Sequence, residues 1–146
     1  MVPILLGRVQ TRLFLLALVG AAVTALITPI LPGIDAPPAD RYRTTFTILA
    51  AVAVVGIGWE FVYHFLMQFR WEKDWPSLFG LLTVVPEGVL LWVLLRRDLV
   101  PFVPAQPPLA AFLLHFGTVW LAVWLVANGP MRVPFLRWRF RGGRLV

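Results

Sequence analysis

The sequence predicts an all-α integral membrane protein, a four-helix bundle of up-down-up-down topology with both termini in the cytoplasm. Of its 146 residues, 60% are hydrophobic and 14% are charged, whereas soluble domains contain about 25% charged residues. Four apolar segments each reach the roughly 20 residues that a helix needs to cross a bilayer. They must be helical, because lipid offers no other partner to backbone N–H and C=O groups. Basic residues gather near the chain ends, as cytoplasmic anchors do.

The expected spans are residues 13–31, 45–69, 76–96 and 108–128, in a single membrane domain of residues 1–146 with a basic cytoplasmic tail at 129–146. The first span has no charged residue. The small residues of Ala22–Ala25 would suit the cleavage site of a secretory signal. The apolar run continues to Leu31, however, and is longer than a signal core, so we expect a span that is retained.

The distribution of basic residues predicts orientation and compartment. Twelve of the thirteen are arginine, which suggests a bacterial protein, and five lie in the last fifteen positions. The positive-inside rule then predicts a multi-pass protein of the cytoplasmic (plasma) membrane with both termini inside, although Arg96 and Arg97 face outward. The residues expected to contact an anionic lipid surface are Arg132, Arg137, Arg139, Arg141 and Arg144. Because anchoring accounts for this charge, no nucleic-acid partner is expected.

One face of each span carries small or polar residues, and these faces are expected to meet inside the bundle, where small side chains let helices approach. The faces comprise Ala17, Gly20, Ala21, Thr24 and Thr28 in the first span; Gly56, Glu60, Tyr63, His64, Met67 and Gln68 in the second; Gly80, Thr83 and Glu87 in the third; and Ala111, His115, Thr118 and Ala122 in the fourth. Trp120 and Trp124 are expected on a different face of the fourth span.

The ionisable side chains within the spans are the main candidates for a functional site. A charge at the bilayer centre costs about 2.5–3.5 kcal/mol on insertion scales, so each group needs a partner, a proton or water. With a rise of about 1.5 Å per residue, the groups form a staircase across the membrane that consists of His64, Glu60, Glu87 and His115. Glu60 and His64 are four residues apart and within reach of each other. Gln68 and Tyr63 complete the candidate proton-relay or binding residues.

Several roles are open for these side chains. Buried polar groups often only hold membrane helices in register, whereas groups that titrate near neutral pH can carry protons. A metal could be held by Glu60, His64 and Glu87, with His115 as a further ligand. The spacing Glu-x-x-x-His differs from the Glu-x-x-His of di-iron bundles, and the HExxH zinc motif is absent. A haem between the two histidines is disfavoured by a separation in depth of about 16 Å. No motif indicates a cofactor.

The third span contains a predicted kink. Pro86 has no N–H to donate to the carbonyl of Leu82, and Gly88 leaves room for a neighbouring helix. Such a kink is ordinary in a membrane helix, where proline and glycine are tolerated. The functional alternative is a hinge or a binding notch at Pro86 and Gly88.

The size of the chain favours an accessory or assembly subunit of a larger membrane complex, since four spans enclose little volume and small-residue faces suit lateral packing. The expected partners are the lipid bilayer and either other membrane subunits or further copies of this chain. The alternative is a proton-coupled transporter or an ion path through Glu60, His64 and Glu87. A second alternative is a metal- or quinone-dependent membrane enzyme. A phosphate loop, a nucleophile elbow and a kinase signature are all absent, so the sequence identifies no catalytic residue and favours a non-enzyme.

Overall fold

The computed structural model describes residues 4–71 and 76–146, and every regular element in that part of the chain is a helix. Four helical segments are long and apolar enough to cross a membrane: Leu5–Ile30, Pro38–Met67, Ser77–Arg96 and Leu109–Arg132. The expectation of an all-α chain with four apolar helices of membrane length is therefore confirmed.

The first span consists of four consecutive helical pieces. They are α1 (Leu5–Leu15), a π-helical turn η1 (Leu16–Gly20), α2 (Ala21–Ile27) and a 3-10 turn η2 (Thr28–Ile30). The helix begins at residue 5, not at residue 13 as expected, so Arg8 and Arg12 lie inside the span. A prediction from hydropathy alone ends a span at an arginine. Both of these arginines are paired with carboxylates of other spans, so the span can continue past them.

The remaining spans follow the expected order. Helix α3 (Pro38–Met67) has a proline in its first turn, where no backbone N–H is needed. The third span is divided at Thr83 into α4 (Ser77–Leu82) and α5 (Val84–Arg96), next to the carbonyl that Pro86 cannot bond. The fourth span is α6 (Leu109–Asn128), which is followed by η3 (Pro130–Arg132) and α7 (Leu136–Phe140).

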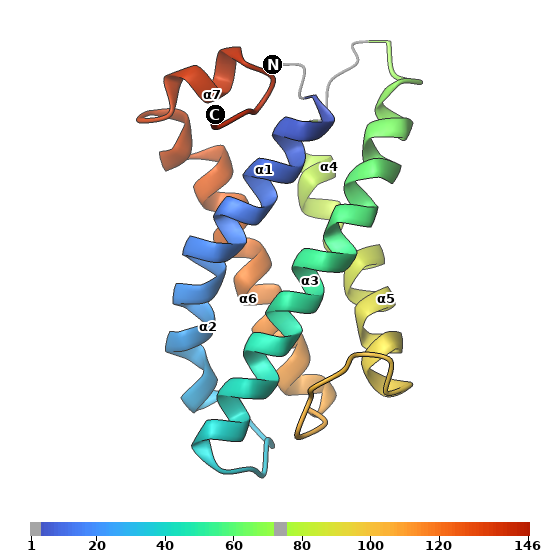
Figure 1. The fold of residues 1–146 in the computed structure, drawn as a ribbon, viewed down its shortest axis with the longest axis vertical. Helices are drawn as coiled ribbons and strands as arrows, with labels where there is room; N and C mark the ends of the chain where they lie inside the picture. Colours follow the sequence, from blue (N-terminus) through green and yellow to red (C-terminus); the bar gives the residue numbers. More distant parts are fainter. Residues whose placement is uncertain (1–3, 72–75) are drawn as a thin grey trace.

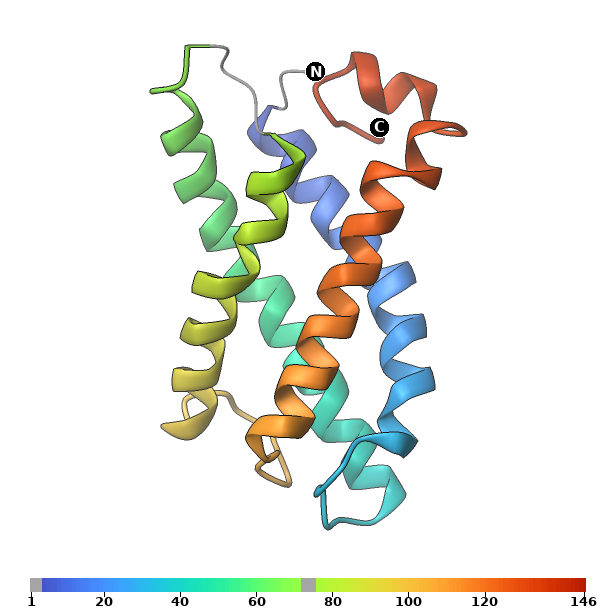
Figure 2. The same cartoon turned by 180° about the vertical axis from the view of Figure 1, so that it is seen from behind.

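The four spans lie side by side along the long axis of the molecule. The start of α1 and helix α7 are at one end, and the connections 31–37 and 97–108 are at the other (Figure 1). Seen from behind, α5 and α6 lie in front of α2 and α3 (Figure 2), so the bundle has two layers. Its centre is filled by apolar side chains from all four spans, among them Leu16, Ile48, Leu91 and Phe112.

The C-terminal tail folds back onto the start of α1. The indole ring of Trp138 is buried against Leu15. Gly142 and Gly143 have φ angles of 63° and 86°, which glycine adopts without strain. Gly7 lets the two backbones meet, since a Cβ at this position would lie 2.7 Å from the carbonyl carbon of Gly143. The tail is therefore packed against the bundle by its backbone and its tryptophan.

The arginines of the tail are mostly on the surface. Arg132, Arg137, Arg141 and Arg144 are exposed, and the side chain of Arg139 lies outside the described part of the chain. Their expected contact with anionic lipid stays a prediction.

Candidate functional site

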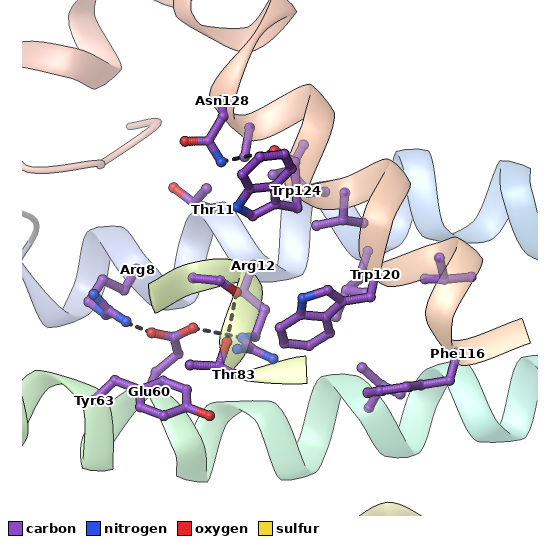
Figure 3. Close-up of a pocket in the computed structure, with 17 residues that line it drawn as sticks. Arg8, Thr11, Arg12, Glu60, Tyr63, Thr83, Phe116, Trp120, Trp124 and Asn128 are labelled. Atoms are coloured by element: carbon purple, nitrogen blue, oxygen red, sulfur yellow. Dashed lines mark hydrogen bonds and ion pairs between the residues drawn. The ribbon is translucent and has the colours of Figure 1, made fainter. Parts of the chain in front are cut away.

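Arg12 joins three spans in a cluster of ion pairs. Its Nε donates to Oε1 of Glu60 on α3 at 2.7 Å, and its two terminal nitrogens donate to the two carboxylate oxygens of Glu87 on α5 at 2.8 and 2.9 Å. Arg8, one helical turn earlier, donates from Nε to Oε2 of Glu60 at 2.6 Å. Figure 3 shows the two arginines on either side of the Glu60 carboxylate. We call these four residues the Arg–Glu cluster.

Neighbouring residues fix the position of the Arg12 side chain. A Cβ at Gly56 would lie 2.9 Å from Cδ of Arg12 and would clash with its guanidinium group, so the arginine crosses α3 where that helix has no side chain. On the other side, the guanidinium carbon lies 5.5 Å from the ring centroid of Trp120 on α6, a distance that permits a cation–π interaction. Arg12 is thus held between α3 and α6.

The Arg–Glu cluster is buried and electrically balanced. The exposed fraction of its four side chains is between 4% and 11%, and two positive charges face two negative ones. All four carboxylate oxygens accept a short hydrogen bond from a guanidinium group, and such charge-assisted bonds are stronger than neutral ones. Because no partner of a buried ion pair can be removed cheaply, the cluster ties α1, α3 and α5 together.

A cavity of about 230 Å³ lies beside the cluster, between α1, α3, α4 and α6. One end of it is polar and is formed by Arg8, Arg12 and Glu60. Along α6 its wall is aromatic and is formed by Phe116, Trp120 and Trp124 (Figure 3). Pockets that bind small molecules have volumes of about 300–1,000 Å³ and apolar walls with a few polar groups. At about 230 Å³ the cavity is smaller than this range, but its lining is of the same kind and it has room for a ring-sized group.

No protein family, curated protein or solved structure matches this chain. No activity or ligand can therefore be carried over from a relative. The function has to follow from the chemistry of the Arg–Glu cluster and of the cavity.

The structure brings together only some of the residues that the sequence singled out on α3. Glu60 is in the cluster, and Tyr63, which is 5% exposed, lines the cavity and stacks on Trp59 with ring centroids 5.5 Å apart. His64 does not join them: its Nδ1 is buried and has no hydrogen-bond partner among the described residues. Gln68, at the C-terminal end of α3, is exposed.

His115 belongs to a second polar group, apart from the Arg–Glu cluster. Its Nε2 lies 2.9 Å from Oγ1 of Thr24. The backbone carbonyl of Thr24 accepts a hydrogen bond from Oγ1 of Thr28 at 2.6 Å, and Oγ1 of Thr28 lies 2.8 Å from Oγ1 of Thr45. None of the four side chains is more than 2% exposed. The group connects the first span to α3 and α6, which is the registering role of buried polar residues in membrane helices.

The expected proton staircase stays a prediction, and the ligands of the expected metal site are not grouped within the described residues. Glu60 and Glu87 meet through Arg12 instead of through a histidine, and His115 bonds to Thr24. Within residues 4–71 and 76–146, no three His, Cys, Asp or Glu side chains are grouped so that they could hold a metal ion. Positive arginines in contact with both carboxylates would also repel a cation.

The proposed hinge region shows a break and a close helix contact. The third span is interrupted at Thr83, whose Oγ1 donates to the carbonyl of Gly80 at 2.8 Å. At Gly88, a Cβ would lie 2.8 Å from the ring of Phe116, so glycine is what allows α5 to approach α6. Whether Pro86 and Gly88 act as a moving hinge stays a prediction.

Sequence reasoning missed the basic and aromatic residues of the site. From the sequence, Arg8 and Arg12 were interpreted as anchors that flank the first span, and Trp120 and Trp124 as residues of a different face of the fourth span. One signal for the arginines was present: they continue inward-facing positions at steps of four, which are Arg8, Arg12, Leu16, Gly20, Thr24 and Thr28. The tryptophans give no comparable signal.

Proposed function

We propose that this chain is a small polytopic membrane protein that binds a membrane-soluble small molecule in the cavity beside the Arg–Glu cluster. The observation that carries the proposal is the cavity itself, which is polar at one end and aromatic along α6. An apolar pocket with a few convergent polar groups is the usual form of a small-molecule site.

The sequence keeps this space open with small residues. Gly80 lines the cavity from α4, and a Cβ there would meet only the indole of Trp124, at 3.9 Å. Ala127 lines it from α6. A larger apolar residue at either position would bury more surface and stabilise the bundle. The presence of small residues at these positions therefore favours a cavity that holds a bound molecule.

Filling the cavity tests the proposal. The Ala127→Phe variant places a ring in the cavity, whereas Ala110→Phe adds the same ring at an exposed position of the same helix. The proteins are purified from membranes in mild detergent, and the bound small molecules are extracted and identified by mass spectrometry. The parent and the Ala110→Phe variant should retain a lipophilic compound at about one molecule per chain, and Ala127→Phe should lose it.

Equal extracts from all three proteins would contradict the proposal, provided that their thermal unfolding shows them to be folded. A compound lost from both variants would place its binding site elsewhere on the apolar surface.

A role as accessory or assembly subunit is a second candidate, favoured by one exposed stripe of α3. The stripe comprises Ala50, Val54, Gly58, Val62 and Leu66, all exposed. A Cβ at Gly58 would meet nothing within 4 Å, and exposed glycines on a membrane helix let a second helix approach closely. If a partner packs there, Gly58→Leu should reduce its co-purification, while Gly117→Leu, at a similarly open glycine of α6, should not. A chain that purifies only as a monomer would exclude this role.

The finer topology is part of the proposal. We place the end that holds α7 and the start of α1 in the cytoplasm, which gives an up-down-up-down bundle in the cytoplasmic membrane. The support is the concentration of exposed arginines on the tail at that end, as the positive-inside rule requires.

A further inference from the structure

Trp120, one of the residues that line the cavity, has an indole N–H with no hydrogen-bond acceptor among the described residues. Its Nε1 is buried, and its ring lines the cavity beside Arg12 (Figure 3). The indole of Trp124, next along the same wall, differs because its Nε1 donates to the carbonyl of Ser77 at 2.9 Å. Buried N–H groups are rarely left without an acceptor. An occupant that offers an acceptor atom to Trp120 would satisfy this one.

Several polar groups at the cavity are already bonded within the protein. Each carboxylate oxygen of Glu60 accepts from an arginine. The hydroxyl groups of Thr11 and Thr83 donate their hydrogens to the backbone carbonyls of Gly143 and Gly80. The hydrogens of both hydroxyl groups are therefore used, whereas the N–H of Trp120 is not, which favours an occupant that carries a hydrogen-bond acceptor.

The charge balance of the cluster argues for an uncharged occupant. Two arginines already face two glutamates at distances of 2.6 to 2.8 Å. An added carboxylate, phosphate or ammonium group would find no countercharge without breaking one of these pairs, and an uncompensated charge in a buried site is strongly unfavourable. Fatty acids and amines are thus disfavoured as ligands.

The aromatic wall favours a flat ring. The rings of Phe116 and Trp120 have centroids 5.6 Å apart, and Trp124 continues the same wall. Aromatic faces and edges of this kind pack well against another planar ring.

We propose that the cavity binds a quinone, an uncharged planar ring with carbonyl oxygens, and that the indole N–H of Trp120 donates to one of those carbonyls. This inference rests on the proposed small-molecule function of the same cavity and specifies its ligand class. It concerns binding alone and assigns no redox reaction to the chain.

The experiment measures binding of decylubiquinone to the purified full-length protein in nanodiscs. Protein and ligand are equilibrated, the nanodiscs are separated, and the retained quinone is extracted and quantified, with protein-free nanodiscs as the baseline for partitioning. Trp120→Phe removes the N–H donor and keeps an aromatic ring. Trp59→Phe is the matched control, because Nε1 of Trp59 is also buried and unpartnered among the described residues but this residue does not line the cavity.

We expect about one quinone per chain above the baseline. Loss of one hydrogen bond should weaken binding to Trp120→Phe about three- to tenfold, while Trp59→Phe binds like the parent. Decylbenzene, which has the ring and the tail without carbonyl oxygens, should bind more weakly than the quinone. Decanoic acid should not compete.

The two proposals fail in different ways. One outcome is that decylubiquinone binds and Ala127→Phe abolishes binding. If Trp120→Phe then binds the quinone like the parent, or decylbenzene binds as tightly as the quinone, the cavity is a site but the assignment of the quinone carbonyl to Trp120 is wrong. If decanoic acid displaces the quinone, the ligand class is wrong. If nothing exceeds the baseline in the parent protein while a lipophilic compound still co-purifies with it, the quinone is excluded and the small-molecule function stands. If no compound binds or co-purifies, both are excluded.

Discussion

Arg12 is the residue on which the Arg–Glu cluster depends. It bonds to carboxylates of two other helices, and its guanidinium group has the planar, forked geometry that permits a bidentate pair with Glu87. A lysine offers a single point charge and could not reproduce this arrangement. The residue therefore sets the relative positions of α1, α3 and α5, and with them one end of the cavity.

Removing the charge of Glu87 should destabilise the protein strongly. Glu87→Gln keeps the shape of the side chain but leaves part of the Arg12 charge buried without a counter-ion, and breaking a buried pair in this way costs about 3–5 kcal/mol. The free energy of unfolding, measured by denaturant titration in detergent micelles, should fall by that order. Arg12→Gln combined with Glu87→Gln should lose less than the sum of the two single variants. Additive losses would show that the pair is not coupled.

The two glycines of α3 offer a paired test of how closely Arg12 packs. Gly56→Ala forces a methyl group into Arg12, and overpacking of this kind costs about 1–3 kcal/mol. Gly58→Ala places the same methyl group where nothing lies within 4 Å and should gain up to about 1 kcal/mol from helix propensity. Thermal unfolding of both variants should therefore shift in opposite directions. A similar loss of stability in both would argue against the close approach of Arg12 to α3.

At the scale of the helix, the sequence identified the buried carboxylates and the buried face of α3, but it extended that face too far, to His64 and Gln68. The expected stripe of α3 runs through Gly56, Glu60, His64 and Gln68 at steps of four and is widened by Tyr63 and Met67. Four residues turn an α-helix by about 400°, so a strict step of four drifts by about 40° each time. After Glu60 the buried positions shift to Tyr63 and Met67. The drift accumulated over successive steps leaves His64 only partly buried and Gln68 exposed.

The first span shows the opposite behaviour, because its steps of four do stay on one side. Leu16, Gly20, Thr24 and Thr28 are all buried. The π-helical turn η1 (Leu16–Gly20) closes its hydrogen bonds over five residues instead of four. It therefore turns the chain less per residue and offsets part of the drift. The spacing of four residues from Arg12 to Thr24 indicated this common face, but the π-turn that keeps it aligned has no recognised signature in the sequence.

Substitution of Thr24 tests the second polar group, in which His115 bonds to Thr24. Thr24→Val keeps the shape of the side chain but removes the hydroxyl that bonds to His115, and a buried polar atom left without its partner costs about 1–3 kcal/mol. Unfolding in detergent should show this loss. The control is Thr118→Val, at an exposed position of α6, where the change should stay within about 0.5 kcal/mol. Equal losses of stability in Thr24→Val and Thr118→Val would contradict the registering role of the Thr24–His115 pair.

At the scale of the whole molecule, composition and hydropathy were sufficient to predict four helical spans, whereas long-range packing was not accessible. The tail was expected only as a basic surface segment. Its backbone instead packs on α1 through Gly7, Gly142 and Gly143, and Nε1 of Trp138 donates to Oγ1 of Thr11 at 2.7 Å. Contacts between residues more than one hundred positions apart leave no periodic pattern in the sequence, so they emerge only from the folded structure.

Gly7 should control whether the tail stays in place. Gly7→Ala introduces a Cβ that would lie 2.9 Å from the backbone nitrogen of Arg144 and even closer to Gly142, so the tail has to move away. Limited trypsin digestion in detergent should then cleave after Arg141 and Arg144 several times faster than in the parent, because segments with few packed contacts open more readily. Gly117→Ala, at an open position of α6, should leave the cleavage rate unchanged. Unaltered digestion of Gly7→Ala would contradict the packing of the tail.

The orientation of the whole bundle can be decided with single cysteines, because the natural sequence contains none. Val146 is at the end that we place in the cytoplasm, and Phe102 is in the connection at the opposite end; both are highly exposed, at 88% and 79%. In intact spheroplasts, a membrane-impermeant maleimide should label the Phe102→Cys variant and not the Val146→Cys variant, and lysis should make both reactive. Arg96 and Arg97 oppose this orientation under the positive-inside rule, so the outcome depends on whether the five arginines of the tail outweigh them. Labelling of Val146→Cys alone in intact cells would invert the bundle and place the Arg–Glu cluster in the outer half of the membrane.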